Sequence, residues 1–430
     1  MQPDEGPVER SLLPMTARVA ASGALSVSGL DLVELADRFG TPLFVYDEAH
    51  LRDRCRQARA AWGDGVAYAT KAFLCLSMAR LAHEEGLCLD VSTGGELHVA
   101  LTAGVPADRL VMHGNNKSDE ELVRAAEVGV GRIVVDSFDE ISRLRRLVGD
   151  RPSRPPLSVM VRVTPGVEAH THEFVRTGQD DTKFGFSLAS GAADKAVQEL
   201  RALPGIELVG IHAHIGSQVF RAESFADEAQ ILASFASPLD LAELCVGGGL
   251  GVPYIAGEAA PTMAEWADTV RSACRRAGLP EGVRITAEPG RAVVAGAAVT
   301  LYRVGTIKDL PGLRTYVAVD GGMSDNPRPV LYGSGYEAFL PRCTDASRPL
   351  AARLVGKHCE SGDVLVADAR LPTDLAVGDV LATPVTGAYG YSMASNYNKV
   401  PRPAVVFVHD GEARVVVRRE TMEDLTRLDG

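Results

Sequence analysis

The chain has 430 residues, 46% of them hydrophobic and 23% charged, which is typical of soluble globular proteins and excludes a fibrous or wholly disordered chain. At about 150 residues per domain, the length predicts two to three domains, or one large barrel with a smaller partner. The formal net charge of -12 argues against nucleic acid or an anionic membrane surface as the main partner.

No apolar run approaches the roughly 18 residues that a membrane span needs. The start, MQPDEGPVER, lacks the basic-then-apolar order of a signal peptide. We therefore expect a cytoplasmic protein. The seven cysteines are odd in number and never spaced as CxxC. This pattern favours reduced thiols over a disulfide framework or a structural zinc site.

The N-terminal region divides into two segments. Residues 1–23 carry Pro, Gly and charge without a sustained period, which predicts a poorly ordered arm. In residues 24–46 a helical apolar spacing ends at Gly40, and an extended run, Leu43 to Tyr46, follows. We expect this second segment to pack with a β-rich domain.

From residue 65 to residue 291 one pattern recurs: a short β-branched run, a turn, and a longer amphipathic stretch. There are eight such runs, at 65–71, 87–93, 109–115, 132–137, 157–165, 208–216, 241–249 and 283–291. Eight alternations of strand and helix without a hairpin signal predict a (β/α)8 TIM-type barrel over residues 47–300. An open doubly wound sheet is the alternative.

After residue 300 the β-rich runs become closely spaced and are separated by short turns. This pattern predicts a C-terminal antiparallel β-sandwich or β-barrel domain over residues 301–430. The acidic segment ETMEDLTRL at residues 420–428 looks like a helix that caps this domain.

Active sites of (β/α)8 barrels lie at the C-terminal ends of the strands, so the residues that close each run are candidates. Lys71 is the one lysine of seven that ends a predicted barrel strand. A lysine on a rigid element in a pocket can supply the neutral amine for a Schiff base. The ordinary alternative is a solvated lysine at the start of a helix.

Two further patterns involve glycine and histidine. The run Gly247 to Gly251 would let backbone N–H groups approach an anion, although it matches neither a dinucleotide fingerprint nor a P-loop. His212 and His214 point to one face of a strand and could form a metal pair, completed by His170, His172 or His113. The competing role for one of these histidines is to stack on a flat ring.

One cofactor accounts for these residues, and we expect it instead of a metal. Pyridoxal phosphate (PLP) needs a lysine for its aldehyde, donors for its phosphate, a carboxylate at its ring nitrogen and a flat group on its ring face. The sequence offers these groups in Lys71, in Ser217 with the glycine run, in Glu288 and in His214.

At these residues the chain resembles the alanine-racemase-fold PLP-dependent decarboxylases, and among them closely the diaminopimelate decarboxylase family. The resemblance covers about residues 30–408. The matching segments are YATKAF (68–73), DVSTGGEL (90–97), HGNNKS (113–118), TGQDDTKFGF (177–186), HAHIGSQ (212–218), VGGGLG (246–251), AEPGR (287–291), DGGMSDNPRPVLY (320–332), CESGD (359–363) and GAYGYSMASNYN (387–398).

The resemblance implies a role for each matching position. Lys71 would form the Schiff base, His214 would stack on the ring and Glu288 would pair with its nitrogen. The residues expected around the phosphate and the substrate are Ser217, Gly249, Gly290, Arg291 and Tyr389. The residues expected to bind the carboxylate that is kept are Arg291, Arg328 and Tyr332.

The resemblance also implies a homodimer with shared active sites. Cys359 and Glu360 would reach in from the partner subunit, as the catalytic cysteine and as the acid that reads the distal amino group. Either Cys359 or Lys71 would then reprotonate the α-carbon.

The implied reaction is decarboxylation of meso-2,6-diaminopimelate to L-lysine, the last step of lysine biosynthesis. Arginines suit a second carboxylate and Glu360 suits a second ammonium. The alternatives are a barrel metallohydrolase, a decarboxylase of ornithine, arginine or lysine with the same fold, and a non-catalytic relative.

Overall fold

A computed structural model of the chain describes residues 6–149, 155–166 and 182–430. The chain divides into two compact units. The barrel unit comprises Cys55–Gly251 and Ala260–Gly290, and the sheet unit comprises Met1–Arg54, Val252–Ala259 and Arg291–Gly430.

The barrel unit contains a ring of eight parallel strands, as the repeating pattern predicted. In ring order they are β5 (Ala67–Ala69), β6 (Cys88–Val91), β7 (Leu110–Met112), β8 (Arg132–Val135), β9 (Leu157–Thr164), β11 (Ile206–His212), β12 (Glu243–Cys245) and β13 (Arg284–Thr286). The short β10 (Phe186–Ser187) pairs with β9 outside this order. The backbone N–H of Ala67 donates to the Ala287 carbonyl at 3.0 Å, and that of Ala69 donates to the Pro289 carbonyl at 3.2 Å. These bonds join the first strand to the segment that follows the last one, which excludes the open doubly wound sheet.

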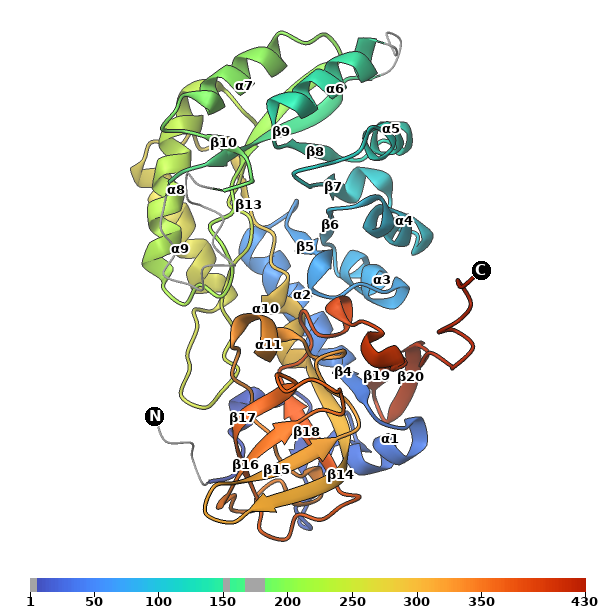
Figure 1. Cartoon of the computed structure of the whole chain (residues 1–430). Helices are drawn as coiled ribbons and strands as arrows, with labels where there is room; N and C mark the ends of the chain where they lie inside the picture. Colours follow the sequence, from blue (N-terminus) through green and yellow to red (C-terminus); the bar gives the residue numbers. More distant parts are fainter. Residues whose placement is uncertain (1–5, 150–154, 167–181) are drawn as a thin grey trace. The chain divides into compact units, whose positions relative to one another are not determined.

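Helices alternate with the strands along the barrel unit (Figure 1). They are α2 (Glu48–Trp62), which begins in the sheet unit, α3 (Leu76–Glu84), α4 (Gly94–Thr102), α5 (Asp119–Val128), α6 (Phe138–Gly149), α7 (Ala192–Arg201), α8 (Ala222–Ala236) and α9 (Met263–Arg276). The start of α5 is fixed by a capping box between Ser118 and Glu121. Among the described residues, no helix is both long and apolar enough to cross a membrane.

The interior of the ring is apolar in its middle layer. Six strands each contribute one residue to a single buried cluster, formed by Ala67, Cys88, Val111, Val134, Met160 and Cys245. Side chains of a strand alternate between its two faces, so the residues two positions further along point into the ring as well. The next layer therefore lies at the C-terminal ends of the strands.

The sheet unit is built on a long strand, β14 (Ala298–Leu310). Its sheet has the order β17 (Val364–Leu371), β16 (Leu350–Val355), β15 (Arg314–Val319), β14, β4 (Leu43–Asp47), β19 (Ala404–His409) and β20 (Glu412–Val417), and β18 (Val380–Pro384) also pairs with β14. Strand β4 lies antiparallel to β14 and parallel to β19. The early segment of the chain is therefore an internal strand of this mostly antiparallel sheet.

Short elements complete the sheet unit. A three-stranded sheet is formed by β1 (Arg18–Val19), β2 (Leu25–Val27) and β3 (Leu30–Asp31), and the helices are α1 (Leu32–Phe39), α10 (Arg291–Val294) and α11 (Arg328–Tyr332). Helix α1 is capped at its start by Asp31, whose side chain accepts from the N–H groups of Val33 and Glu34. It ends at Gly40, where the sequence placed its end.

Two expectations about the ends of the chain need correction. Within the expected arm of residues 1–23, the side chains of Val8, Leu12 and Leu13 are buried, and Val8 and Leu13 belong to the sheet unit's core. These apolar residues are too few for a periodic pattern but anchor the segment. Residues 420–428 do not form the expected capping helix; residues 422–428 form turns instead. Met422 and Leu428 are 69% and 89% exposed, so this segment has no apolar face to bury.

The predicted domain limits of 47–300 and 301–430 differ from the division in the structure, which falls at Cys55 and Arg291. The segment Val252–Ala259 also belongs to the sheet unit. Its Tyr254 accepts a hydrogen bond from Arg291. Such a side-chain contact between distant segments leaves no periodic signal in the sequence.

A buried ion pair connects α6 to the loop after β7. The Lys117 ammonium lies 2.7 Å from Glu140, and both side chains are buried. Lys117 also donates to the carbonyls of Gly114 and Val134, at 2.7 Å each. The three acceptors compensate the cost of burying this cation, so Lys117 has a structural role.

Substitution of Lys117 by methionine should lower the free energy of unfolding by about 3–5 kcal/mol, because it leaves the Glu140 carboxylate buried without its cation. Urea unfolding measures this difference. The matched control is Lys195→Met on α7, where the lysine side chain is 67% exposed. The control should change stability by less than about 0.5 kcal/mol. Equal losses in both variants would contradict a structural role for the pair.

Candidate active site

On four strands of the barrel unit, a polar layer begins two residues beyond the apolar cluster. Asp90 follows Cys88, His113 follows Val111, Asp136 follows Val134 and Arg162 follows Met160 at this spacing. All four are buried. The period of two therefore places them on the inner face at the C-terminal ends of the strands, where barrel enzymes form their sites.

Lys71 lies in a 3-10 turn, Thr70–Ala72, directly after β5. Its side chain is exposed in this structure. Lys117, the other lysine near a strand end, is held by Glu140 and two carbonyls. Of these two lysines, Lys71 is the exposed one.

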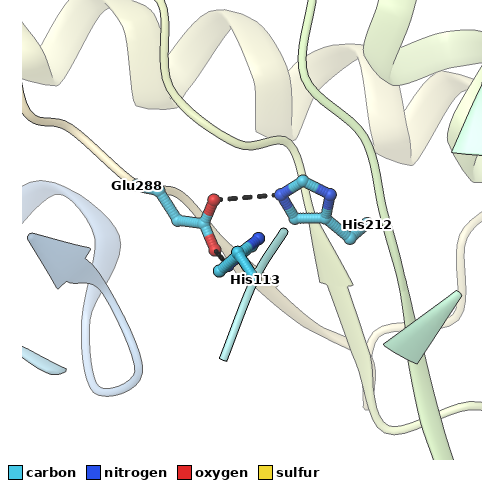
Figure 2. A group of neighbouring side chains, drawn as sticks. All are labelled: His113, His212 and Glu288. Carbon is cyan, nitrogen blue, oxygen red and sulfur yellow. Dashed lines mark hydrogen bonds and ion pairs between the residues drawn. The ribbon is translucent and has the colours of Figure 1, made fainter. Parts of the chain in front are cut away.

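Glu288 lies two residues after β13 and contacts two histidines (Figure 2). His113 Nε2 is 2.8 Å from Glu288 Oε1, and His212 Nε2 is 2.9 Å from Glu288 Oε2. All three residues are buried. Each carboxylate oxygen therefore has one imidazole partner.

The pKa values in this group reflect competition between burial and charge. Burial alone would raise the pKa of Glu288, but His113 and His212 together hold it well below its usual range. Burial lowers the pKa of His113, yet Asp90 and Glu288 raise it above its ordinary value. The pKa of His212 is lowered, mainly by burial. Glu288 is thus an ionised carboxylate inside the barrel.

His214 has different surroundings from His212, contrary to the expectation of a pair on one strand face. Strand β11 ends at His212, and His214 Nδ1 accepts a hydrogen bond from the backbone N–H of Gly248 at 3.1 Å. Burial, followed by the charge of Lys71, holds the pKa of His214 well below its usual range. His214 is therefore a neutral imidazole with a fixed ring orientation.

The glycine run after β12 packs so closely that side chains would not fit. A Cβ at Gly247 would lie 2.4 Å from the Ala213 carbonyl oxygen, and one at Gly249 would lie 2.5 Å from that of Gly216. The Val219 N–H donates to the Gly249 carbonyl at 2.9 Å, so the loop with Ser217 runs beside this glycine loop. Backbone and hydroxyl donors are thereby gathered at two neighbouring strand ends.

Gly290 lies where the first and last strand ends approach each other closely. A Cβ at Gly290 would lie 3.0 Å from the Ala69 carbonyl oxygen and 3.1 Å from the Ala72 Cβ. These two alanines flank the turn that carries Lys71. The absence of a side chain at Gly290 therefore lets the segment after Glu288 lie against that turn.

In the sheet unit, two buried arginines share tyrosine partners. Arg291 Nη1 donates to the Tyr254 hydroxyl at 2.7 Å, and Arg328 Nη1 donates to the Tyr336 hydroxyl at 2.6 Å. The Arg328 guanidinium also lies 4.1 Å from the centre of the Tyr254 ring. Among the described residues no carboxylate forms an ion pair with Arg328, although it is only 3% exposed. Such a buried cation suits an anionic ligand.

Tyr332 and Tyr389 are the two sequence-predicted tyrosines of this unit. Tyr332 ends α11, which begins at Arg328, and is half-buried. Tyr389 has φ +57°, a left-handed conformation that side chains rarely adopt, and its ring lies 4.7 Å from the Arg291 guanidinium. Backbone strain of this kind concentrates at functional sites.

The loop with Cys359 is held from both sides while its thiol stays accessible. Of the seven cysteines, all within the described residues, Cys359 is the only exposed one. Its N–H donates to Asn398 Oδ1 at 3.1 Å, and the neighbouring His358 lies 2.8 Å from the Ser324 hydroxyl. Glu360 is exposed beside it. This exposure excludes the ordinary alternative of a core thiol.

Sequence reasoning missed three partners and left one set of residues untested. It did not identify His113 and His212 as partners of Glu288, or Tyr254 as a partner of both arginines, since these contacts join distant segments. The polar position of His113 at a strand end was the available signal. His170 and His172, named in the metal alternative, lie outside the described residues.

Three comparisons with known proteins all find decarboxylases. Residues 48–295 match the family model "Pyridoxal-dependent decarboxylase, pyridoxal binding domain". The chain is 48% identical over 427 residues to the diaminopimelate decarboxylase of Mycobacterium tuberculosis, covering 95% of each, and 45% identical over 432 residues to that of Bacillus subtilis, covering 96% and 97%. The structure resembles the diaminopimelate decarboxylase of M. jannaschii in complex with L-lysine, with a TM-score of 0.90, 32% identity and coverage of 96% and 98%.

These matches exclude the metallohydrolase alternative. His113, His212 and Glu288 do converge as metal ligands could, with ligand atoms within 4.8 Å of one another. However, the match to a pyridoxal-binding domain covers all three residues and assigns the barrel a PLP cofactor. The chain therefore belongs to the pyridoxal-dependent decarboxylases, and within them it is an enzyme of the diaminopimelate decarboxylase family.

Proposed function

We propose that this enzyme converts meso-2,6-diaminopimelate to L-lysine and carbon dioxide, as the last step of lysine biosynthesis. The observation that carries the proposal is the 48% identity to a named diaminopimelate decarboxylase over 95% of both chains. Two solved relatives, from M. jannaschii and Helicobacter pylori, were crystallised with L-lysine, which is the product of this reaction.

The barrel unit has the groups that PLP requires. The cofactor supplies an electron sink for the charge that decarboxylation leaves on the α-carbon. Lys71 has the amine for its aldehyde, His214 is a neutral flat ring for its face, and Glu288 is an ionised acid for its ring nitrogen. The barrel residues proposed for its phosphate end are Ser217, Gly249 and Gly290; the roles proposed for Arg291 and Tyr389, which belong to the sheet unit, rest on the family resemblance. The tight approach at Gly249 supports this assignment, because only bare backbone fits there.

The charge of Glu288 favours decarboxylation over racemisation. A carboxylate beside a ring nitrogen stabilises its protonated form, which strengthens the electron sink, whereas a basic residue would not. The low pKa of Glu288, held down by His113 and His212 against burial, supports this role.

We assign the carboxylate that is kept to Arg291, Arg328 and Tyr332. The lack of an acidic partner for buried Arg328 among the described residues supports this assignment, since a substrate carboxylate would compensate its charge. Ornithine, arginine and lysine have no second carboxylate. A pair of arginines therefore favours diaminopimelate.

We assign proton delivery to Cys359 and recognition of the distal ammonium to Glu360. The exposed thiol on an anchored loop supports a role outside its own subunit's core. We therefore propose a homodimer in which each subunit contributes Cys359 and Glu360 to the active site of its partner. After carbon dioxide leaves, the Cys359 thiol donates its proton to the α-carbon, with Lys71 as the rival donor.

Purified protein should release carbon dioxide from meso-2,6-diaminopimelate, and only when PLP is present, because the electron sink is the cofactor's. Gas release and lysine formation measure the reaction, and ornithine, arginine and lysine serve as competing substrates. Preference for one of these three would overturn the substrate assignment and leave the family unchanged.

The Lys71→Ala variant should lose both turnover and covalent cofactor, because alanine has no amine to bond the aldehyde. Borohydride reduction followed by intact-protein mass spectrometry measures the attached cofactor. Lys195→Ala, which removes an exposed lysine on α7, is the control and should retain it. A reduced cofactor still attached in the Lys71 variant would refute the assignment.

Cys359→Ala should lower kcat by about 10²–10⁴-fold, the usual contribution of a general acid, with a smaller change in KM. Cys343→Ala, at a half-buried cysteine of the same unit, is the control. Mixing Lys71→Ala with Cys359→Ala subunits should restore about a quarter of the wild-type activity, because half of the dimers are mixed and each has one intact site. Confirmed mixed dimers without activity would rule out shared sites.

A further inference from the structure

Two buried histidines hold Glu288 although the assigned chemistry uses neither of them. His113 and His212 come from different strand ends and approach opposite oxygens of the carboxylate, as Figure 2 shows. A carboxylate oxygen has two lone-pair directions, and each histidine uses one. One direction on each oxygen therefore remains for a further donor.

The hydrogen bonding of His212 indicates that its role is to bind Glu288. Its Nε2 lies 2.9 Å from Glu288 Oε2, while its Nδ1 is buried and has no hydrogen-bond partner among the described residues. A histidine retained for packing alone would leave a costly buried nitrogen for no gain. Within the described part of the chain, Glu288 is the one group that fixes this ring through a hydrogen bond.

Charged side chains from several strand ends surround Glu288 and its two histidines. Asp90 Oδ1 lies 3.7 Å from His113 Nε2, so His113 stands between two carboxylates. Their charges raise the pKa of His113, whereas that of His212 is lowered mainly by burial. Two cationic side chains also act on this group: burial lowers the pKa of Arg162 against the charges of Asp136, Glu288 and Asp90, and the charge of Lys71 lowers the pKa of His113. A protonated pyridine nitrogen would be a further partner for the Glu288 carboxylate.

We propose that His113 and His212 are positioning residues that orient Glu288 and weaken it as a proton acceptor, so that the shared proton stays on the cofactor's ring nitrogen. This proposal rests on the proposed role of Glu288. A donor on each oxygen stabilises the ionised carboxylate, which leaves the proton on the partner. His113 has the larger part, because the neighbouring carboxylates Asp90 and Glu288 favour its charged form, whereas burial disfavours that of His212.

The test is the protonation of the ring nitrogen, observed by ¹⁵N NMR of holoenzyme loaded with PLP labelled at that nitrogen. Spectra between about pH 6 and 9 should show a protonated nitrogen throughout in the wild type. In His113→Gln the pH at which the ring nitrogen loses its proton should fall by at least about one unit, and in His212→Gln it should fall by less. Glutamine keeps an amide donor but cannot carry the charge. His98→Gln on α4, at an exposed histidine, is the control and should match the wild type.

Activity gives a second reading of the same variants. At a pH where the nitrogen of His113→Gln has lost its proton, kcat should be at least about tenfold below the wild-type value, while KM changes little. A purely structural role would instead lower cofactor binding or thermal stability and leave the nitrogen's titration unchanged. That result would overturn the proposal.

The Glu288→Gln variant distinguishes this proposal from the proposed role of Glu288 on which it rests. If Glu288→Gln titrates like the wild type, the role of Glu288 itself is wrong. If Glu288→Gln loses the protonated signal while both histidine variants keep it, only the positioning roles are wrong. Should His113→Gln not fold, Asp90→Asn keeps the imidazole but removes one carboxylate beside it. That variant should shift the titration in the same direction, and wild-type behaviour would contradict the proposal.

Discussion

Closure of the strand ring is the constraint on which the barrel unit's site depends. The hydrogen bond from the Ala69 N–H to the Pro289 carbonyl joins the first strand to the segment after the last. Lys71 follows Ala69 by two residues and Glu288 precedes Pro289 by one, so this single bond brings residues more than two hundred positions apart to one end of the ring. Gly290 permits the approach, because any Cβ there would meet Ala69 and Ala72 at 3.0–3.1 Å.

Compensation of buried charge decides what each polar residue of this layer can do. Lys117 is surrounded by three acceptors and has a structural role, whereas Lys71 is exposed. Glu288 has donors on both oxygens and stays ionised in the interior. The partners of a buried charge therefore decide its state, and composition and spacing do not reveal these partners.

In the sheet unit, too, the partners of a buried charge decide its role, but here the charge is positive. Arg328 is buried with tyrosine hydroxyls and rings around it and without an acid among the described residues, so its charge is available to a ligand. The loop of Cys359 is anchored through Asn398, while the thiol itself stays exposed. Anchored backbone combined with an accessible reactive atom is the arrangement that proton delivery requires.

The sequence by itself determined the architecture and the candidate residues. Alternation of β-branched runs with amphipathic stretches predicted all eight barrel strands, and the end of each run located Lys71, His113 and Glu288. Local periodicity suffices there, because each strand or helix must bury one face wherever it lies. The anchored N-terminal segment and the turns at the C-terminus were predicted wrongly, since a few buried or exposed apolar side chains decide such segments.

Only the tertiary structure decided the partners: which histidines bind Glu288, which acid compensates Lys117, and that Tyr254 contacts both arginines. These contacts join segments far apart in the chain. They depend on ring closure and packing, which no local period encodes.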